Sequence, residues 1–372
     1  MGGLYVHIPF CRKRCTYCDF HFSTTFENYR SALIGALCLE LKNRASESTG
    51  PLQTLYFGGG TPSLLRAPEW QQLFDQLHQS YLLEATSEIT IEANPEDLNL
   101  ENLMLWRSLG INRLSIGIQS FENENLKWMN RAHAATDAVL GVKRAQECGF
   151  SNISVDLIYG LPGQQLSHWK QELETLRKLQ VQHLSAYCLT VEPKTALNYL
   201  VRRKKLQAAD ELIQTAHYQY LLEWAEANGF EHYEISNFST PGHQSKHNRS
   251  YWQFKPYIGI GPSAHSFDGK SRRWNVRNNT HYIRSVGKTN DWFERELLTK
   301  NERWNEQLLV GLRTKWGVML SDLEGPFTAA EQATIEAYSK QDLLVKTPTQ
   351  LFLTERGKWQ ADGIAAALFR VD

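Results

Sequence analysis

The residues from 5 to 18 read YVHIPFCRKRCTYC, and this stretch decides how the rest of the chain is interpreted. It opens with β-branched and aromatic residues, a pattern typical of a β-strand. It then continues into three cysteines, Cys11, Cys15 and Cys18. Their spacings of four and three residues allow one short loop to carry all three thiols. We therefore expect a metal-binding loop directly after the first strand of the fold.

Three thiolates in one loop suit a 4Fe-4S cluster in which one iron has no protein ligand. An open iron predicts a site for a small chelating ligand, and in radical S-adenosylmethionine (SAM) proteins the amino and carboxylate groups of SAM occupy it. The alternatives are a zinc site or three incidental thiols. The glycine-rich segment from Gly58 to Pro62 follows the second predicted strand, so two loops would converge at one sheet end. This context favours the cluster.

Short β-branched or aromatic segments alternate with longer amphipathic segments, as a parallel α/β sheet requires. Six such units predict a partial (β/α)6 barrel, because a closed barrel of this kind has eight. Ligand-type residues follow several strands, so one end of the sheet is predicted to be the active face. The predicted strands cover 4–8, 54–57, 88–92, 113–118, 153–158 and 183–189, and the predicted helices cover 29–42, 69–79, 100–109, 136–147 and 166–179.

The pattern divides the chain into three predicted regions. Residues 1–230 form the barrel and end with a long helix over about 208–228. Residues 231–303 are rich in Tyr, Gly and Pro, and we expect an irregular extension packed beside the barrel. Residues 304–372 contain two helical segments, 306–314 and 329–340, and two strand-like segments, 343–347 and 351–354. This last region is predicted to be a small winged-helix-like α+β domain.

The overall composition excludes several classes of partner. Lys and Arg total 40, and Asp and Glu also total 40, so no net charge attracts nucleic acid, and we expect no nucleic-acid partner. No apolar segment approaches the ~18 residues that a membrane-spanning helix needs. The first strand begins without a basic and apolar signal region, and we expect a cytoplasmic protein.

The chain resembles the HemW family of heme chaperones, which are relatives of the oxygen-independent coproporphyrinogen III dehydrogenase HemN. The resemblance extends over nearly the whole chain, and it rests on an ordered series of motifs. These motifs are Tyr5 to Cys11, Gly58 to Ser63, Glu92 to Pro95, Ile116 to Phe121, Asp156 with Gly160 to Gly163, and His247 to Trp252. The resemblance implies a radical SAM barrel as the fold.

The resemblance also implies a SAM site beside a cluster held by the three cysteines. Glycine lets a backbone approach a ligand closely, and a guanidinium matches a carboxylate in bidentate geometry. Taken singly, such residues are more often turn glycines or surface charges. The implied roles are that Tyr5 and Tyr17 lie against SAM, that the backbone of Gly59, Gly60 and Thr61 receives its amino group, that Arg131 pairs with its carboxylate, and that Glu92, Gln119 and Asp156 hold the ribose and neighbouring atoms.

Two departures put dehydrogenase activity in doubt. The HemN branch has a further cysteine two positions after the third cluster cysteine, where this chain has Phe20. Ten residues precede Cys11, which we expect to leave no room for the N-terminal segment of that branch.

The chaperone branch implies heme as a ligand. An imidazole can ligate heme iron, so His247 is the candidate ligand, while Tyr251 and Trp252 can pack on the macrocycle and Arg249 can meet a propionate. The alternative is that His247 is a plain loop histidine and that the two aromatic residues anchor a domain junction.

We therefore expect a protein that binds heme and transfers it to an acceptor, such as a respiratory heme protein, with the cluster and SAM controlling its state. The alternative is an oxygen-independent coproporphyrinogen III dehydrogenase, in which a deoxyadenosyl radical abstracts hydrogen from a propionate side chain and starts oxidative decarboxylation. A third possibility is a radical SAM enzyme with another substrate.

Overall fold

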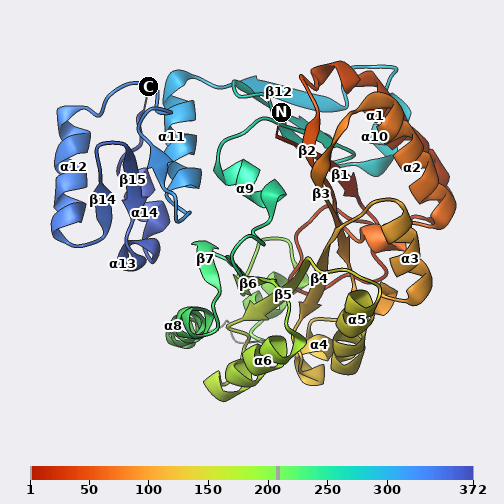
Figure 1. The fold of residues 1–372 in the computed structure, drawn as a ribbon, viewed down its shortest axis with the longest axis horizontal. Coiled ribbons are helices and arrows are strands. Elements are labelled where there is room, and N and C mark those ends of the chain that lie inside the picture. Colours follow the sequence, from red (N-terminus) through yellow and green to blue (C-terminus); the bar gives the residue numbers. More distant parts are fainter. Residues whose placement is uncertain (1, 207–209, 372) are drawn as a thin grey trace.

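A single sheet of 12 strands forms the centre of the molecule, whose computed structural model describes residues 2–206 and 210–371 (Figure 1). The strand order is β12-β11-β10-β9-β1-β2-β3-β4-β5-β6-β8-β7, and the six strands from β1 to β6 are parallel. The partial six-unit α/β barrel predicted from the sequence is confirmed. The six strands are β1 (Gly3–Ile8), β2 (Leu52–Gly59), β3 (Leu83–Ala93), β4 (Arg113–Gln119), β5 (Ile153–Tyr159) and β6 (His183–Cys188).

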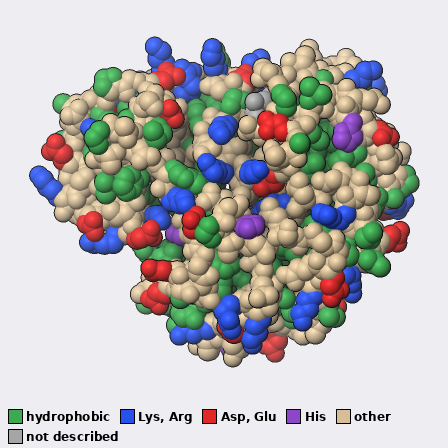
Figure 2. All heavy atoms as spheres, viewed as in Figure 1, with side chains coloured by type: hydrophobic (Ala, Val, Ile, Leu, Met, Phe, Trp, Pro, Cys, Tyr) green, Lys and Arg blue, Asp and Glu red, His purple; other side chains and the backbone are tan. Residues whose placement is uncertain are grey.

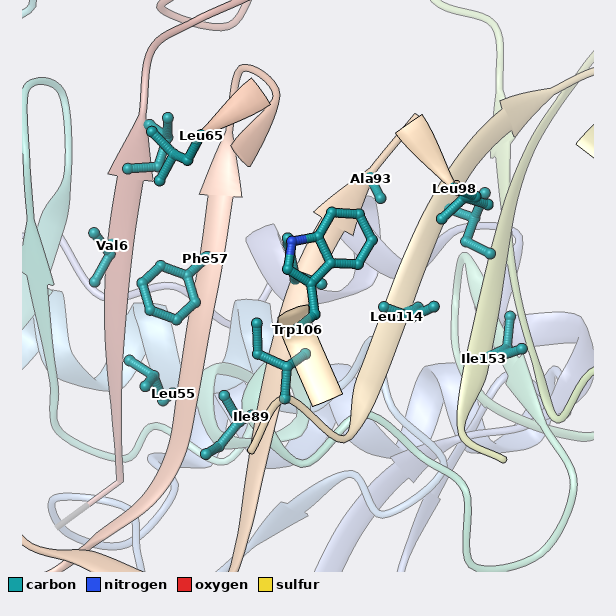
Figure 3. Close-up of a cluster of buried hydrophobic side chains, with 14 of the residues drawn as sticks. Val6, Leu55, Phe57, Leu65, Ile89, Ala93, Leu98, Trp106, Leu114 and Ile153 are labelled. Atoms are coloured by element: carbon teal, nitrogen blue, oxygen red, sulfur yellow. The ribbon is translucent and has the colours of Figure 1, made fainter. Parts of the chain in front are cut away.

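Helices connect these strands and cover their outer side (Figure 1). Side chains such as Phe57 and Leu114 point outward and meet Trp106 in a fully buried core (Figure 3). Because successive strand residues alternate sides, the polar residues between them face the inside of the barrel. The helices are α1 (Arg30–Asn43), α2 (Ala67–Ser80), α3 (Leu100–Ser108), α4 (Asn123–Trp128), α5 (Ala135–Glu147), α6 (Leu166–Leu179) and α7 (Ala196–Arg202). The sequence did not predict the short helices α4 and α7.

The region from 231 to 303 is more regular than expected, and the prediction of an irregular extension was wrong. Its strands extend the sheet at both edges. At one edge β8 (Asn237–Ser239) pairs with β6, and β7 (Glu231–Glu234) follows it outward. At the other edge β9 (Tyr257–Ile260) pairs with β1, followed outward by β10 (His265–Phe267), β11 (Ser271–Asn275) and β12 (Phe293–Leu297). Strands this short are too brief for their alternation to be recognised in a sequence. The region also holds α9 (Lys246–Trp252) and α10 (Asn279–Ser285).

The long helix α8 (Glu211–Ala227) precedes this region. Its predicted start at residue 208 lies outside the described residues.

The C-terminal region has its own core and its own sheet. Trp304, Leu308 and Leu351 are fully buried there, in a cluster separate from that of the barrel. The elements are α11 (Lys300–Gly311), β13 (Val318–Met319), α12 (Ala329–Lys340), β14 (Leu344–Lys346), β15 (Gln350–Leu353), α13 (Glu355–Lys358) and α14 (Ala361–Ala366), and the sheet is antiparallel in the order β13-β15-β14. This arrangement agrees with the predicted small α+β region. None of the described helices has the length and apolar character needed to cross a membrane.

Candidate functional site

A pocket of about 380 Å³ opens at the end of the barrel where the parallel strands finish. The cysteine loop after β1, the glycine loop after β2 and polar side chains from β3, β4 and β5 form its wall. The pocket brings together every residue predicted for the cluster and SAM except Tyr5, and it does not include His247 or the other residues predicted to contact heme. Those lining it are Cys11, Cys15, Tyr17, Cys18, Gly59, Gly60, Thr61, Glu92, Gln119, Arg131 and Asp156.

Backbone and side-chain hydrogen bonds fix the cysteine loop at the pocket. The Cys11 amide donates to the Ser23 carbonyl at 3.0 Å, and the Thr61 hydroxyl donates to the Cys11 sulfur at 3.5 Å. Within the described residues, no three His, Cys, Asp or Glu side chains close on a single metal ion. In a cubane each thiolate binds a different iron, and the three thiols of this loop line one pocket, as such a cluster requires. Burial raises the pKa of Cys11 to about 12 and that of Cys18 to about 11, so both thiols keep their protons until a metal displaces them.

The glycine loop requires glycine because it lies directly against β1. Gly59 has a φ of 107°, and a Cβ there would lie 2.5 Å from the His7 ring. A Cβ on Gly60 would lie 2.7 Å from the Phe10 carbonyl oxygen, and the Gly60 amide donates to the Ile8 carbonyl at 2.9 Å. This close packing holds the Gly and Cys loops together at one end of the barrel.

Two buried carboxyl groups lie on the pocket wall. Glu92 accepts a hydrogen bond from the Tyr56 hydroxyl at 2.9 Å and one from the Gly59 amide at 3.0 Å. Asp156 accepts from the Ser115 hydroxyl at 3.4 Å. Burial raises the pKa of Glu92 to about 7 and that of Asp156 to about 6, because desolvation disfavours the ionised form. Both groups therefore change charge near neutral pH, and both suit a ligand that offers hydroxyl groups or a positive charge.

Arg131 supplies a positive charge between the two loops. Its guanidinium donates to the Asn94 side-chain oxygen at 2.7 Å, to the Gly117 carbonyl at 2.6 Å and to the Cys15 sulfur at 3.4 Å. Gln119 nearby has a φ of 72° at the point where the β4–β5 register shifts. In this left-handed backbone conformation, Gln119 lies on the pocket wall.

The sequence did not predict several residues of this site, and two of them bear directly on its geometry. Asn94 orients Arg131, and Tyr187 lines the pocket from β6. The position of each residue on its strand could have indicated its place in the site. Asn94 follows Glu92 at the end of β3, and Tyr187 shares the inward face of β6 with Ser185, which pairs in register with Asp156.

Tyr5 lies below the pocket, inside the barrel. Its hydroxyl is hydrogen-bonded to His7 Nδ1 at 3.0 Å, and Tyr5 pairs in register with Tyr56. Tyr56 precedes Gly59 by three residues, which corresponds to roughly 10 Å along a strand. Tyr5 therefore supports His7, the residue against which Gly59 packs, and does not itself line the pocket.

His247 lies in α9 and is buried at the opposite end of the barrel. Its Nδ1 is hydrogen-bonded to Thr54 Oγ1 at 2.7 Å, and its Nε2 is hydrogen-bonded to the Tyr251 hydroxyl at 2.7 Å. Its ring stacks on Tyr56 at 4.9 Å. Burial lowers the pKa of His247 to about 3, so the imidazole is neutral at physiological pH.

Contacts with the beginnings of the strands fix α9 across this end of the barrel. The Glu88 carboxylate accepts hydrogen bonds from the backbone amides of Lys246 and His247, both at 3.1 Å. Thr54 precedes Gly59 by five residues, which corresponds to roughly 16 Å along a strand. His247 and the cysteine loop thus lie at opposite ends of the barrel.

The outer side of α9 meets the C-terminal region from α11 to α14, which we call the C-terminal lobe. The Arg249 guanidinium lies 4.8 Å from the ring centre of Trp316, and the Arg313 guanidinium lies 5.9 Å from that of Trp252. Lys and Arg side chains gather between the C-terminal lobe and the rest of the molecule in Figure 2. The motif from His247 to Trp252 therefore joins the end of the barrel to the C-terminal lobe.

Comparison with known proteins identifies the family. Residues 5–176 match the Radical SAM superfamily, and residues 298–359 match the HemN C-terminal domain. The heme chaperone HemW of Bacillus subtilis (strain 168) is 34% identical over 369 residues, which cover 96% of this chain and 96% of that protein. The chain belongs to the HemW family of radical SAM proteins. Membership in this superfamily implies a 4Fe-4S cluster and SAM as cofactors.

Further relatives agree with the HemW assignment. HemW of Lactococcus lactis subsp. lactis (strain IL1403) is 34% identical, with 96% of this chain and 94% of that protein covered. The solved structure of coproporphyrinogen III oxidase (HemN) from Escherichia coli matches 99% of this chain and 90% of its own, with a TM-score of 0.87 at 23% identity. At this identity the likeness demonstrates a shared fold, which includes the C-terminal region.

Proposed function

We propose that this HemW-family chain is a heme chaperone that binds heme and transfers it to an acceptor protein, with a respiratory heme protein as the candidate acceptor. The observation that carries the proposal is the similarity, over 96% of the chain, to a protein named heme chaperone HemW. We also propose a cytoplasmic location. All six cysteines are free, as is usual where thiols are kept reduced.

The cofactor site of this proposal is the pocket at the strand ends. Cys11, Cys15 and Cys18 would hold the 4Fe-4S cluster, which when bound can supply one electron to a ligand on its open iron. Arg131 would pair with the SAM carboxylate, and the backbone of Gly59 to Thr61 would receive the amino group. Glu92, Gln119 and Asp156 would accept hydrogen bonds from the ribose, and the Tyr17 ring would pack against SAM. Tyr5 would act through His7, as a positioning residue.

The heme site of this proposal is α9 and its junction with the C-terminal lobe. Because both nitrogens of His247 are hydrogen-bonded inside the barrel, iron ligation requires α9 to move away from Thr54. Moving α9 also breaks the hydrogen bonds of the Lys246 and His247 amides to Glu88. Each hydrogen bond that is lost costs about 1 kcal/mol, which iron coordination can offset. After that movement, Trp252 and Trp316 would pack on the macrocycle, and Arg249 would meet a propionate.

Heme titration followed by visible absorption tests this site. We expect His247→Ala to lose the histidine-ligated spectrum. Thr54→Ala removes one hydrogen bond that holds His247 inside the barrel, so this variant should bind heme faster than the wild-type protein. Binding that is unchanged in His247→Ala would remove His247 as the ligand, and slower binding in Thr54→Ala would contradict the opening of α9.

An assay with coproporphyrinogen III separates the chaperone from the alternative enzyme. Anaerobically reconstituted protein with SAM and a reductant should not form protoporphyrinogen IX at an enzymatic rate, whereas heme-loaded protein should transfer heme to an apo-acceptor. Rapid formation of protoporphyrinogen IX would replace the chaperone proposal with the dehydrogenase.

A further inference from the structure

Three side chains form a column that crosses the inside of the barrel from the cofactor pocket to α9. Glu92 lines the pocket, and its Oε1 accepts the hydrogen bond from the Tyr56 hydroxyl at 2.9 Å. The Tyr56 ring stacks on the His247 ring, with 4.9 Å between the ring centres and 25° between the planes. Tyr56 therefore contacts a residue of each proposed site, although the two sites lie at opposite ends of the barrel.

The column is packed too tightly for its members to move independently. A Cβ on Gly58 would lie 2.9 Å from the Tyr56 ring and 2.9 Å from Glu92 Oε1. At the other end of the column, a Cβ on Gly3 would lie 2.7 Å from His247 Nδ1. Close-packed interiors transmit a shift of one side chain to its neighbours. A change in how firmly Glu92 holds Tyr56 is therefore felt at His247.

Tyr5 packs beside the column but does not contact the carboxylate. Its ring lies 6.1 Å from the ring of Tyr56 and 6.4 Å from that of His247, and it is stacked on both. Its hydroxyl is hydrogen-bonded to His7, the residue against which Gly59 packs. Tyr56 is therefore the member of this aromatic stack that holds the pocket carboxylate directly.

Arg113 is another buried group that acts on both ends of the barrel. It is 1% exposed, and its positive charge reaches both Glu92 and His247. Within the described part of the chain, no hydrogen bond joins its guanidinium to either side chain. A guanidinium keeps its charge whether or not a ligand is bound. Arg113 therefore biases both ends constantly and does not report the state of one end to the other.

We propose that Tyr56 is the positioning residue through which SAM in the pocket holds His247 and α9 in the closed position, in which His247 stacks on Tyr56. This inference rests on the proposed SAM and heme sites. The positive charge of SAM favours the ionised form of Glu92, and a carboxylate accepts a stronger hydrogen bond from the Tyr56 hydroxyl than a neutral carboxyl group does. A firmly held Tyr56 keeps its ring on His247, which opposes the opening of α9 that iron ligation requires.

The direction of the coupling between the two ligands follows from these contacts. SAM favours the closed position of α9, whereas ligation of heme iron by His247 requires the open one. Each ligand should therefore weaken the binding of the other by the same factor, and couplings of this kind typically change an affinity by about 5- to 150-fold. Binding of SAM to the heme-loaded chain would then favour the release of heme to an acceptor.

Hydrogen exchange of the α9 amides in the cluster-loaded, heme-free chain, measured with and without SAM, tests the proposal. The test variant is Tyr56→Phe, which removes the hydroxyl and keeps the ring that stacks on His247. The matched control is Tyr81→Phe, which removes a similarly buried hydroxyl that donates to the Leu41 carbonyl at 3.1 Å, on the outer side of the sheet. SAM is added to a concentration that calorimetry shows to be saturating for each protein.

We expect SAM to slow exchange of the α9 amides about fivefold or more in the wild-type chain and in Tyr81→Phe, and to leave it nearly unchanged in Tyr56→Phe. Heme titrations should show the same pattern, with SAM weakening heme binding in the wild-type chain and not in Tyr56→Phe. A purely structural role of the Tyr56 hydroxyl would instead make α9 exchange faster by the same factor with and without SAM, and that result would overturn the proposal.

Other outcomes separate this proposal from the proposed function. Exchange of α9 that SAM leaves unchanged or accelerates in the wild-type chain would overturn the coupling, and equal protection by SAM in Tyr56→Phe would exclude Tyr56 as its route. Unchanged heme binding in His247→Ala, together with protection of α9 that depends on Tyr56, would support the coupling and refute only the heme ligand. A wild-type chain that binds no SAM would refute both the cofactor site and the coupling.

Discussion

Replacing Glu92 by Gln is expected to remove most of the pH dependence of SAM binding. SAM carries a sulfonium charge and ribose hydroxyls, so it should bind more tightly when Glu92 is ionised. Burial raises the pKa of Glu92 to about 7. Between pH 8 and pH 6 the ionised fraction of such a group falls from roughly nine-tenths to one-tenth, so SAM affinity should fall roughly tenfold through this residue. The Gln variant should lack that component.

Calorimetric titration of SAM into anaerobically reconstituted protein at pH 6, 7 and 8 measures the effect. The titration of SAM itself contributes equally to both proteins. Because the Glu92 and Asp156 charges interact, the difference between the two pH profiles measures the ionisation of Glu92 together with its effect on Asp156. The folded state binds more protons than the unfolded state between about pH 4.5 and pH 7, so ionisation of Glu92 costs stability as the pH rises through that range. The Gln variant should therefore unfold at no lower temperature than the wild-type protein at pH 8. A pH slope as steep in the variant as in the wild-type protein would refute the assigned role.

Three further predictions concern the cluster, the buried charges and α9. Cys15→Ser should lose iron, sulfide and the visible charge-transfer absorption. The control Cys38→Ser, which changes a buried thiol in α1, should keep all three. A full cluster in Cys15→Ser would exclude Cys15 as a ligand. Arg44→Ala removes the guanidinium that lies 3.0 Å from the fully buried Glu40 and leaves that carboxylate with the more distant Arg273, at 4.0 Å. This change should cost about 3 kcal/mol in chemical denaturation, whereas Arg177→Ala, at an exposed pair, should have no measurable effect. Equal stability of the two variants would contradict the importance of the buried pair. His247 has a pKa of about 3 in the folded state and about 6.5 when exposed, so the closed position of α9 loses about 1.4 kcal/mol per pH unit on acidification below about pH 6.5. Hydrogen exchange of the α9 amides, corrected for intrinsic rates, should be faster at pH 5 than at neutral pH in the wild-type protein but not in His247→Gln. An opening of α9 that does not depend on pH would contradict this prediction.

The sequence was most informative where a pattern repeats over a whole element. Short β-branched or aromatic segments, such as that of β4, alternate with longer amphipathic segments, and this alternation predicted the six parallel strands and the loops that follow them. The convergence of the cysteine and glycine loops then followed from parallel topology, because the carboxyl ends of parallel strands share one edge.

Long-range packing of short elements could not be predicted in this way. The helix α9 has seven residues, too few for a periodic pattern, and its contacts with Thr54 and Glu88 join positions 193 and 159 residues apart. Nothing in the local sequence indicated that both nitrogens of His247 would be engaged.

The proposed cofactor site depends on a cubane whose fourth iron is open to SAM. Electron paramagnetic resonance of the anaerobically purified, reduced chain, with and without SAM, tests this most directly when it is combined with iron and sulfide analysis. We expect about four irons and about four sulfides per chain, and a cluster signal whose shape changes when SAM is added. Bound zinc without sulfide, or a cluster signal that SAM leaves unchanged, would contradict this cofactor site.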